Sequence, residues 1–123
     1  MKESEKKKIL IIEDEKPLAH ALELKLTHEG YDVVATGSGQ EGLDLLAASK
    51  FDLVLTDLII PGVDGFKMLE TIKDKKIKTP VMVMTNLNQE EDKTRASELG
   101  ATEFFVKSNS PLSSIVENIK KKI

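Results

Sequence analysis

The chain alternates between short apolar runs and longer segments in which apolar residues recur every three or four positions. The runs are typical of strands buried on both faces, and the periodic segments are typical of amphipathic helices. The runs predict five strands, at residues 9–12, 31–35, 51–57, 81–85 and 103–106. The periodic segments predict five helices, starting near Pro17, after the turn at 37–39, and near Gly65, Gln89 and Pro111. Strict alternation favours an α/β fold with one parallel sheet and helices on both faces.

The last two predicted helices differ in apolar content. Helix 89–99 has only Ala96 and Leu99 as clear apolar positions, and Asn88, with Glu91 three residues later, is its predicted N-cap. The final helix has a nearly ideal stripe made of Leu112, Ile115, Val116, Ile119 and Ile123. Because few buried contacts mean a low free energy of local opening, we expect helix 89–99 to be weakly docked and able to move.

Composition narrows the classes of protein. A length of 123 residues predicts one domain, here residues 8–123 after a tail at 1–7. The chain has no cysteine and two histidines, which excludes disulfides and thiolate sites and disfavours a histidine centre. The net charge of −3 does not favour nucleic acid binding. No apolar run reaches membrane-spanning length and no signal peptide is present, so we expect no membrane insertion and a cytoplasmic location.

Polar residues stand at the ends of four predicted strands. Glu13 and Asp14 follow the first strand and Asp57 ends the third, while Thr85 and Lys107 end the fourth and fifth. In a parallel sheet these ends share one edge, where open α/β sheets bind their ligands. Three carboxylates repel one another, and one lysine cannot neutralise them. An all-oxygen set of this kind predicts a hard divalent cation, Mg²⁺, with Mn²⁺ as a possible substitute.

The same edge has the groups that phosphoryl transfer requires. Mg²⁺ held by two carboxylates keeps positions open for phosphate oxygens, and Thr85 and Lys107 can contact the same group. Asp57 would then act as the nucleophile toward phosphorus. Taken singly, these residues could be a turn cap, acids at a helix N-terminus, a turn hydroxyl and a surface charge. Their alignment at four strand ends favours a shared site.

The ordered motifs resemble the receiver domain of two-component response regulators, in particular the chemotaxis-regulator-like single-domain type. The resemblance extends from about Lys8 to Ile123. It is carried by Glu13-Asp14, by Asp57 with Pro61-Gly62 and Asp64-Gly65, by Thr85 and by Lys107. It implies a flavodoxin-like doubly wound sheet of strand order 2-1-3-4-5 with five helices.

The resemblance also implies a switch. Asp57 would accept a phosphoryl group from a sensor histidine kinase or a phosphotransfer protein, with Thr85 and Lys107 as its catalytic partners. Thr85 and Phe104, which lacks the hydroxyl of the more common tyrosine, would then move together. Their movement would change the face formed by helix four, strand five and helix five toward an unknown output protein. Such a domain is no enzyme in the ordinary sense, since it catalyses only its own phosphorylation and dephosphorylation.

The metal ligands are likewise implied by the resemblance. Asp14, Asp57 and the backbone carbonyl of Ile59 would bind Mg²⁺ directly, and Glu13 would act mainly through water. The implied domain binds no nucleic acid by itself and is expected to be a monomer or a weak dimer. Whether it stands alone or is part of a longer regulator stays open.

Besides Phe104, four residues depart from the family pattern. Ser108 follows Lys107 where the family usually has a proline in a cis peptide. Because a non-proline cis bond costs about 3–4 kcal/mol, we expect a trans bond or a different local loop. Asn86 is larger than the usual residue and is expected to narrow access to the phosphoacceptor. Ile59 and Leu87 are apolar and cannot position a water molecule, which predicts slow self-dephosphorylation.

Three other classes remain as alternatives. An aspartyl-phosphate phosphohydrolase usually has a second acid near its nucleophile, but Ile59 stands two positions after Asp57. A phosphorylation-independent interaction domain would have no need for the acids, Thr85 and Lys107. A flavin-binding protein of the same fold would need a hydroxyl-rich phosphate loop after the first strand, where this chain has acids.

Overall fold

The computed structural model describes residues 6–123, so most of the predicted tail at 1–7 lies outside the described residues. The strands of the main sheet are β1 (Lys8–Ile12), β2 (Asp32–Thr36), β3 (Leu53–Thr56), β6 (Val81–Thr85) and β7 (Ala101–Val106). The helices are α1 (Lys16–His28), α2 (Gly39–Ala48), α3 (Gly65–Asp74), α4 (Glu90–Glu98) and α5 (Leu112–Lys122). Two short strands, β4 (Ile59–Ile60) and β5 (Val63–Asp64), follow β3, and a 3₁₀ turn, η2 (Lys107–Asn109), follows β7.

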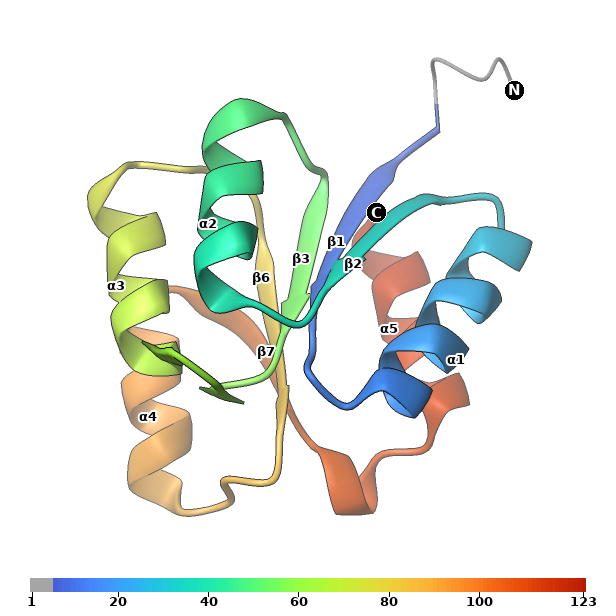
Figure 1. Cartoon of the computed structure of the whole chain (residues 1–123). Helices are drawn as coiled ribbons and strands as arrows, with labels where there is room; N and C mark the ends of the chain where they lie inside the picture. Colours follow the sequence, from blue (N-terminus) through green and yellow to red (C-terminus); the bar gives the residue numbers. More distant parts are fainter. Residues whose placement is uncertain (1–5) are drawn as a thin grey trace.

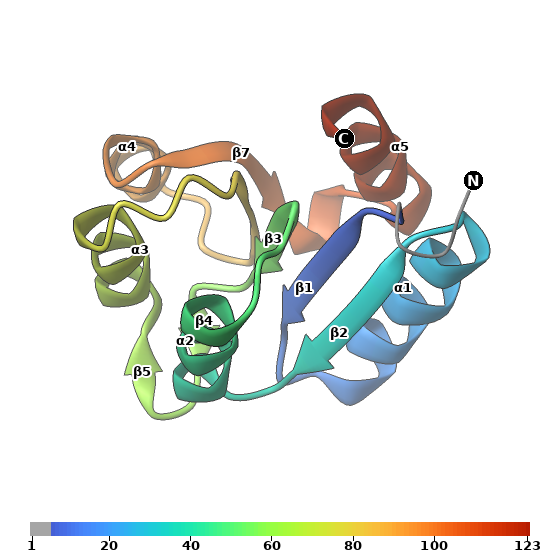
Figure 2. The same ribbon diagram turned by 90° about the horizontal axis from the view of Figure 1, so that it is seen from above.

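The five long strands form one parallel sheet in the order β2-β1-β3-β6-β7. This order is the predicted 2-1-3-4-5, so the flavodoxin-like doubly wound fold is confirmed. Helices α1 and α5 cover one face of the sheet and α2, α3 and α4 cover the other (Figures 1 and 2). The carboxyl ends of all five strands lie at the lower edge in Figure 1.

Each face of the sheet has its own apolar core. On one face, Leu22 and Leu26 of α1 pack with Ile115, Val116 and Ile119 of α5. On the other face, side chains from α2 and α3 dominate, and α4 contributes Ala96. The central strands β1 and β3 have side chains in both clusters. Residues 9–12 and 53–55 are therefore buried on both faces of the sheet, which explains why these runs are wholly apolar.

Several element boundaries differ from those expected. The third strand covers Leu53–Thr56 rather than 51–57, so Asp57 stands just beyond it, although its N–H still donates to Ile12 O at 3.0 Å. The predicted N-cap at Asn88 is wrong, because Gln89 caps α4. Asp92 Oδ2 accepts a hydrogen bond from Gln89 N at 3.3 Å, which fixes the start of the helix one residue later.

The hairpin after Asp57 was not expected from the sequence. Ile59 pairs with Asp64 and Ile60 with Val63 in antiparallel register, and Gly62 turns the chain with φ of +82°. Gly65 then packs so closely on the Leu58 backbone that a Cβ atom would overlap it. Figure 2 shows the hairpin beside α2 and α3. This packing holds the loop that follows Asp57 in place.

Candidate functional site

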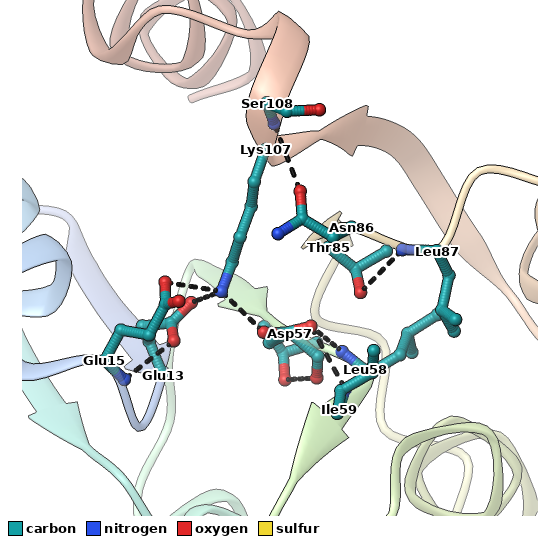
Figure 3. Close-up of polar contacts among 11 residues, drawn as sticks. Glu13, Glu15, Asp57, Leu58, Ile59, Thr85, Asn86, Leu87, Lys107 and Ser108 are labelled. Atoms are coloured by element: carbon teal, nitrogen blue, oxygen red, sulfur yellow. Dashed lines mark hydrogen bonds and ion pairs between the residues drawn. The ribbon is translucent and has the colours of Figure 1, made fainter.

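Asp57 lies at the centre of the carboxyl edge of the sheet, on the loop that leaves β3. Its side chain is 5% exposed. Its Oδ1 atom accepts hydrogen bonds from Leu58 N at 2.7 Å and Ile59 N at 3.0 Å. Its Oδ2 atom lies 2.6 Å from Lys107 Nζ (Figure 3). The carboxylate is therefore fixed by two backbone donors on one oxygen and one ammonium on the other.

Lys107 is the first residue of η2 and reaches back across the edge of the sheet (Figure 3). Its Nζ atom contacts three carboxylates: Asp57 at 2.6 Å, Glu13 at 2.6 Å and Glu15 at 3.0 Å. Burial alone would lower the pKa of Lys107, but the hydrogen bonds to these carboxylates outweigh it and raise the pKa well above its usual range. The ammonium therefore stays charged at every physiological pH.

Glu13 is the most buried acid of the site, at 2% exposure. Burial raises the pKa of its carboxyl, while the contact with Lys107 acts in the opposite direction. Its Oε2 accepts from Glu15 N at 2.9 Å. Its Oε1 forms an ion pair with Lys107 Nζ at 2.6 Å and has no other polar partner among the described residues. The charged carboxylate therefore remains incompletely satisfied.

Three acids at this edge are close enough to share a cation. Carboxylate oxygens of Glu13, Asp14 and Asp57 all lie within 4.8 Å of one another. With Glu15 added, four carboxylates lie at this edge, and the ammonium of Lys107 contacts three of them. Because the available ligands are all oxygen and their excess charge is negative, the residues present fit Mg²⁺.

A pocket of about 220 Å³ opens over these groups. Its lining residues are Asp14, Glu15, Asp57, Ile59, Asn86 and Lys107. Ile59 is 55% exposed, although it is a large apolar residue. Leu87, the other apolar residue expected beside the phosphoryl group, is half-buried and packs against the core under α2, α3 and α4.

Thr85 is only partly integrated into this arrangement. It is fully buried at the end of β6, and its Oγ1 accepts a long hydrogen bond of 3.5 Å from Leu87 N. Within residues 6–123, no hydrogen bond joins this hydroxyl to Asp57 or Lys107. Phe104 is half-buried in β7 and packs against the α2–α3–α4 core. The structure thus brings the acids and Lys107 into contact and leaves the predicted switch pair beside them.

Two contacts of the site were missed in the sequence. Glu15 binds Lys107, and the only available signal was its place directly after the acid pair. Asn86 Oδ1 accepts from Ser108 N at 3.2 Å, which links the loops after β6 and β7. The described chain has no cis peptide bond, so the expected trans bond between Lys107 and Ser108 is confirmed.

Comparison with known proteins agrees with this geometry. Residues 9–120 match the family described as the response regulator receiver domain. The chain belongs to this family. The receiver domain is 35% identical over 100 residues to the cell cycle response regulator CtrA of Brucella ovis. The aligned residues make up 81% of this chain and 43% of CtrA. It therefore spans less than half the length of such curated relatives.

Solved receiver domains have the same fold. The non-phosphorylated HemR receiver domain of Leptospira biflexa is 30% identical, with a TM-score of 0.88 over 95% of this chain and 94% of that one. A CheY-like receiver domain protein of Methanospirillum hungatei JF-1 is 26% identical, with a TM-score of 0.88 over 95% and 93%.

Membership of the family places this chain among signalling domains of two-component systems. Such domains bind Mg²⁺ through clustered acids and act with histidine kinases and output domains. They are not classical enzymes. No helix in the described part of this receiver domain is long and apolar enough to cross a bilayer.

Proposed function

We propose that residues 8–123 form a receiver unit in which Asp57 accepts a phosphoryl group from a sensor histidine kinase or a phosphotransfer protein. The observation that supports this most directly is the environment of the Asp57 carboxylate. Its Oδ2 meets Lys107 Nζ at 2.6 Å at the floor of a pocket that also holds Asp14. A nucleophilic carboxylate, a cation and further metal-binding acids thus meet in one solvent-accessible place.

The transfer step is a displacement at phosphorus. A carboxylate oxygen of Asp57 forms the new bond to phosphorus. The P–N bond to the donor histidine breaks, and the ring nitrogen keeps the electron pair and takes up a proton. Charge spreads over the equatorial phosphoryl oxygens during the step, and the ammonium of Lys107 can offset it there. The remaining contacts of Lys107, to Glu13 and Glu15, hold the ammonium in the pocket when Asp57 loses its charge.

The metal-binding role is assigned to the acids of the pocket. We assign direct ligation to Asp14, Asp57 and the Ile59 carbonyl, and a water-mediated role to Glu13. The burial of Glu13 behind Lys107 supports the indirect role. When bound, Mg²⁺ would neutralise charge on the phosphoryl oxygens. Mn²⁺ prefers the same oxygen ligands and should substitute.

The response to phosphorylation is assigned to Thr85, Phe104 and α4. The Thr85 hydroxyl accepts only a long hydrogen bond of 3.5 Å, from Leu87 N, and its own O–H can donate to a phosphoryl oxygen. Movement of Thr85 changes the space beside Phe104, which lies two positions before Val106, the register partner of Thr85 on β7. The conformation of the face formed by α4, β7 and α5 would then change, and with it the affinity of this face for an output protein.

The lifetime of the phosphoryl group should be long. Ile59 lines the pocket together with Asp57 and is 55% exposed, and its apolar side chain cannot orient an attacking water. Asn86 narrows the same opening. Slow self-dephosphorylation follows, and a phosphoryl half-life of seconds without any phosphatase would contradict this part of the proposal.

The decisive experiment is labelling with acetyl phosphate and Mg²⁺, read by intact mass. Wild type should gain one phosphoryl group, Asp57→Asn should gain none, and a chelator should abolish labelling. Asp74→Asn, an exposed aspartate at the end of α3, is the matched control and should label like wild type. Labelling that survives Asp57→Asn would overturn the assignment. Multiple-turnover phosphate release from a phosphoester would indicate a phosphohydrolase instead.

A further inference from the structure

Asn86 and Ser108 come from different loops and meet at the rim of the pocket. Asn86 directly follows β6, and Ser108 is the second residue of η2. The Ser108 N–H donates to Asn86 Oδ1 at 3.2 Å. Because a backbone N–H can only donate, the side-chain atom that faces it must be the amide oxygen. The contact therefore sets which way the Asn86 amide points.

The amide nitrogen of Asn86 is consequently turned away from Ser108. Figure 3 shows it on the side where Lys107 approaches Asp57. Asn86 also lines the pocket together with these two residues. Its Nδ2 carries two N–H donors, whereas the carboxylates of Asp14 and Glu15 at the same pocket only accept.

An anion that enters this pocket has few side-chain donors available. Lys107 Nζ is already shared among the carboxylates of Glu13, Glu15 and Asp57. The Thr85 hydroxyl is fully buried and lies outside the residues that line the pocket. Asn86 Nδ2 is thus the uncharged donor at the rim, on the opposite loop from Lys107.

Building on the function proposed above, we propose that Asn86 Nδ2 is a direct ligand of the phosphoryl group carried by Asp57, and that the Ser108 N–H holds it in position. A phosphoryl group has three acceptor oxygens, and hydrogen bonds to such a charged group are stronger than those between neutral groups. The link to Ser108 preorganises the amide, so little side-chain entropy is lost when the group arrives.

The alternative role for Asn86 is indirect. In that case its side chain would only steady η2 and thereby Lys107, which would change the acid cluster before any phosphoryl group is present. Mg²⁺ affinity of the unphosphorylated protein would report such a change. A direct ligand would instead leave Mg²⁺ affinity intact and affect only the state in which Asp57 carries a phosphoryl group or its mimic.

The experiment measures the affinity of the full chain for beryllofluoride in saturating Mg²⁺ by ¹⁹F NMR, and Mg²⁺ affinity alone by calorimetry. Asn86→Ala should weaken beryllofluoride binding at least about fivefold, the size expected for one lost hydrogen bond. Asn86→Asp keeps the acceptor for Ser108 but replaces the donor with a charge, so it should weaken binding further. Asn88→Ala, at an exposed asparagine in the same loop, is the matched control and should stay within about twofold of wild type.

The outcomes separate the two proposals. Unchanged Mg²⁺ affinity in Asn86→Ala, with weakened beryllofluoride binding in both Asn86 variants, supports the direct contact. Equal beryllofluoride affinity in wild type and Asn86→Ala overturns it, as does an equal weakening of Mg²⁺ binding. If wild type labels with acetyl phosphate in these cases, the proposed function stands and only the role of Asn86 falls. A wild type that neither labels nor binds beryllofluoride overturns both.

Discussion

Helices α4 and α5 precede and follow the same strand, β7, but differ greatly in how many of their side chains are buried. Helix α5 buries Ile115, Val116 and Ile119 in the core that it shares with α1. Helix α4 buries only Ala96. Two further contacts help to anchor α4: Arg95 stacks on the Phe66 ring at 4.2 Å, and Glu98 O accepts from Lys73 Nζ at 2.9 Å.

The difference shows where a small local event can have a large effect. Burial of one large aliphatic side chain is worth about 1.5–3 kcal/mol, whereas an alanine contributes much less. Shifting α5 would therefore expose three such side chains, while shifting α4 exposes almost none. Both helices follow a loop that reaches the pocket of Asp57, so a signal that starts there should move α4 and leave α5 in place.

The largest expected effect is on the α5 side. Ile119→Ala should lower the free energy of unfolding by about 3 kcal/mol, because it opens a cavity in a fully buried position. Denaturation in urea with circular dichroism measures this loss. Ser113→Ala, at an exposed position of the same helix, should change stability by less than about 0.5 kcal/mol. A loss below about 1 kcal/mol for Ile119→Ala would mean that α5 is no better anchored than α4.

The α4 side should respond locally. Ala96→Gly should cost about 1 kcal/mol, since glycine is a poor helix former and the buried methyl group is lost. Native-state hydrogen exchange should show faster exchange in α4 and unchanged exchange in α5. Ser97→Ala, the exposed neighbour, should not accelerate exchange. Equal acceleration in both helices would show that they open as one unit.

A smaller effect is expected at the pocket that both helices approach. The pKa of the Glu13 carboxyl is raised in the folded state, because burial disfavours its charge. The ionised group therefore destabilises the protein at neutral pH, and this cost disappears as the pH falls below the unfolded pKa. In Mg²⁺-free buffer, Glu13→Gln should be more stable than wild type at pH 7.

The pH dependence is the check on that prediction. The stability difference between Glu13→Gln and wild type should shrink as the pH is lowered, and excess Mg²⁺ should reduce or reverse it at pH 7. Glu103→Gln, at an exposed glutamate of β7, should show no such dependence. A variant less stable than wild type at pH 7 without Mg²⁺ would show that the contact with Lys107 outweighs burial.

The smallest expected effect concerns the surface contact of α4. Arg95→Ala removes the guanidinium from the Phe66 ring and should cost about 0.5–1 kcal/mol. Arg95→Lys should recover part of this loss, because an ammonium also interacts with an aromatic face. Denaturation curves, together with α4 exchange rates, measure both variants. No change in either quantity would leave Ala96 as the main anchor of the helix.

Most of the fold followed from the sequence because buried parallel strands and amphipathic helices have different periodicities. Val81–Thr85 and Leu112–Lys122 show this most clearly, with an unbroken apolar run and a regular stripe. Boundaries were less accurate where tertiary contacts decide them. Phe51 is buried as a loop residue, which made the third strand look longer than it is. The hairpin after Asp57 depends on pairing that apolar content does not reveal.

The site was predictable to the extent that strand ends determine position. Glu13, Asp57 and Lys107 meet as expected, since parallel strands bring their carboxyl ends to one edge. Side-chain direction was not predictable in the same way. The reach of Glu15 to Lys107 and the bond from Ser108 to Asn86 depend on loop backbones that no periodic pattern specifies.

The hairpin after Asp57 also limits how this protein can diversify by mutation. A side chain at position 65 would overlap the Leu58 backbone unless that backbone moved. The residue at position 62 must adopt the left-handed backbone conformation, with a positive φ angle. Ile59, by contrast, projects 55% of its surface from the same hairpin. A lineage can therefore replace Ile59 with a polar or charged residue at little cost to folding. Selection on the duration of the signal should act on that exposed position, while its glycine neighbours stay constant.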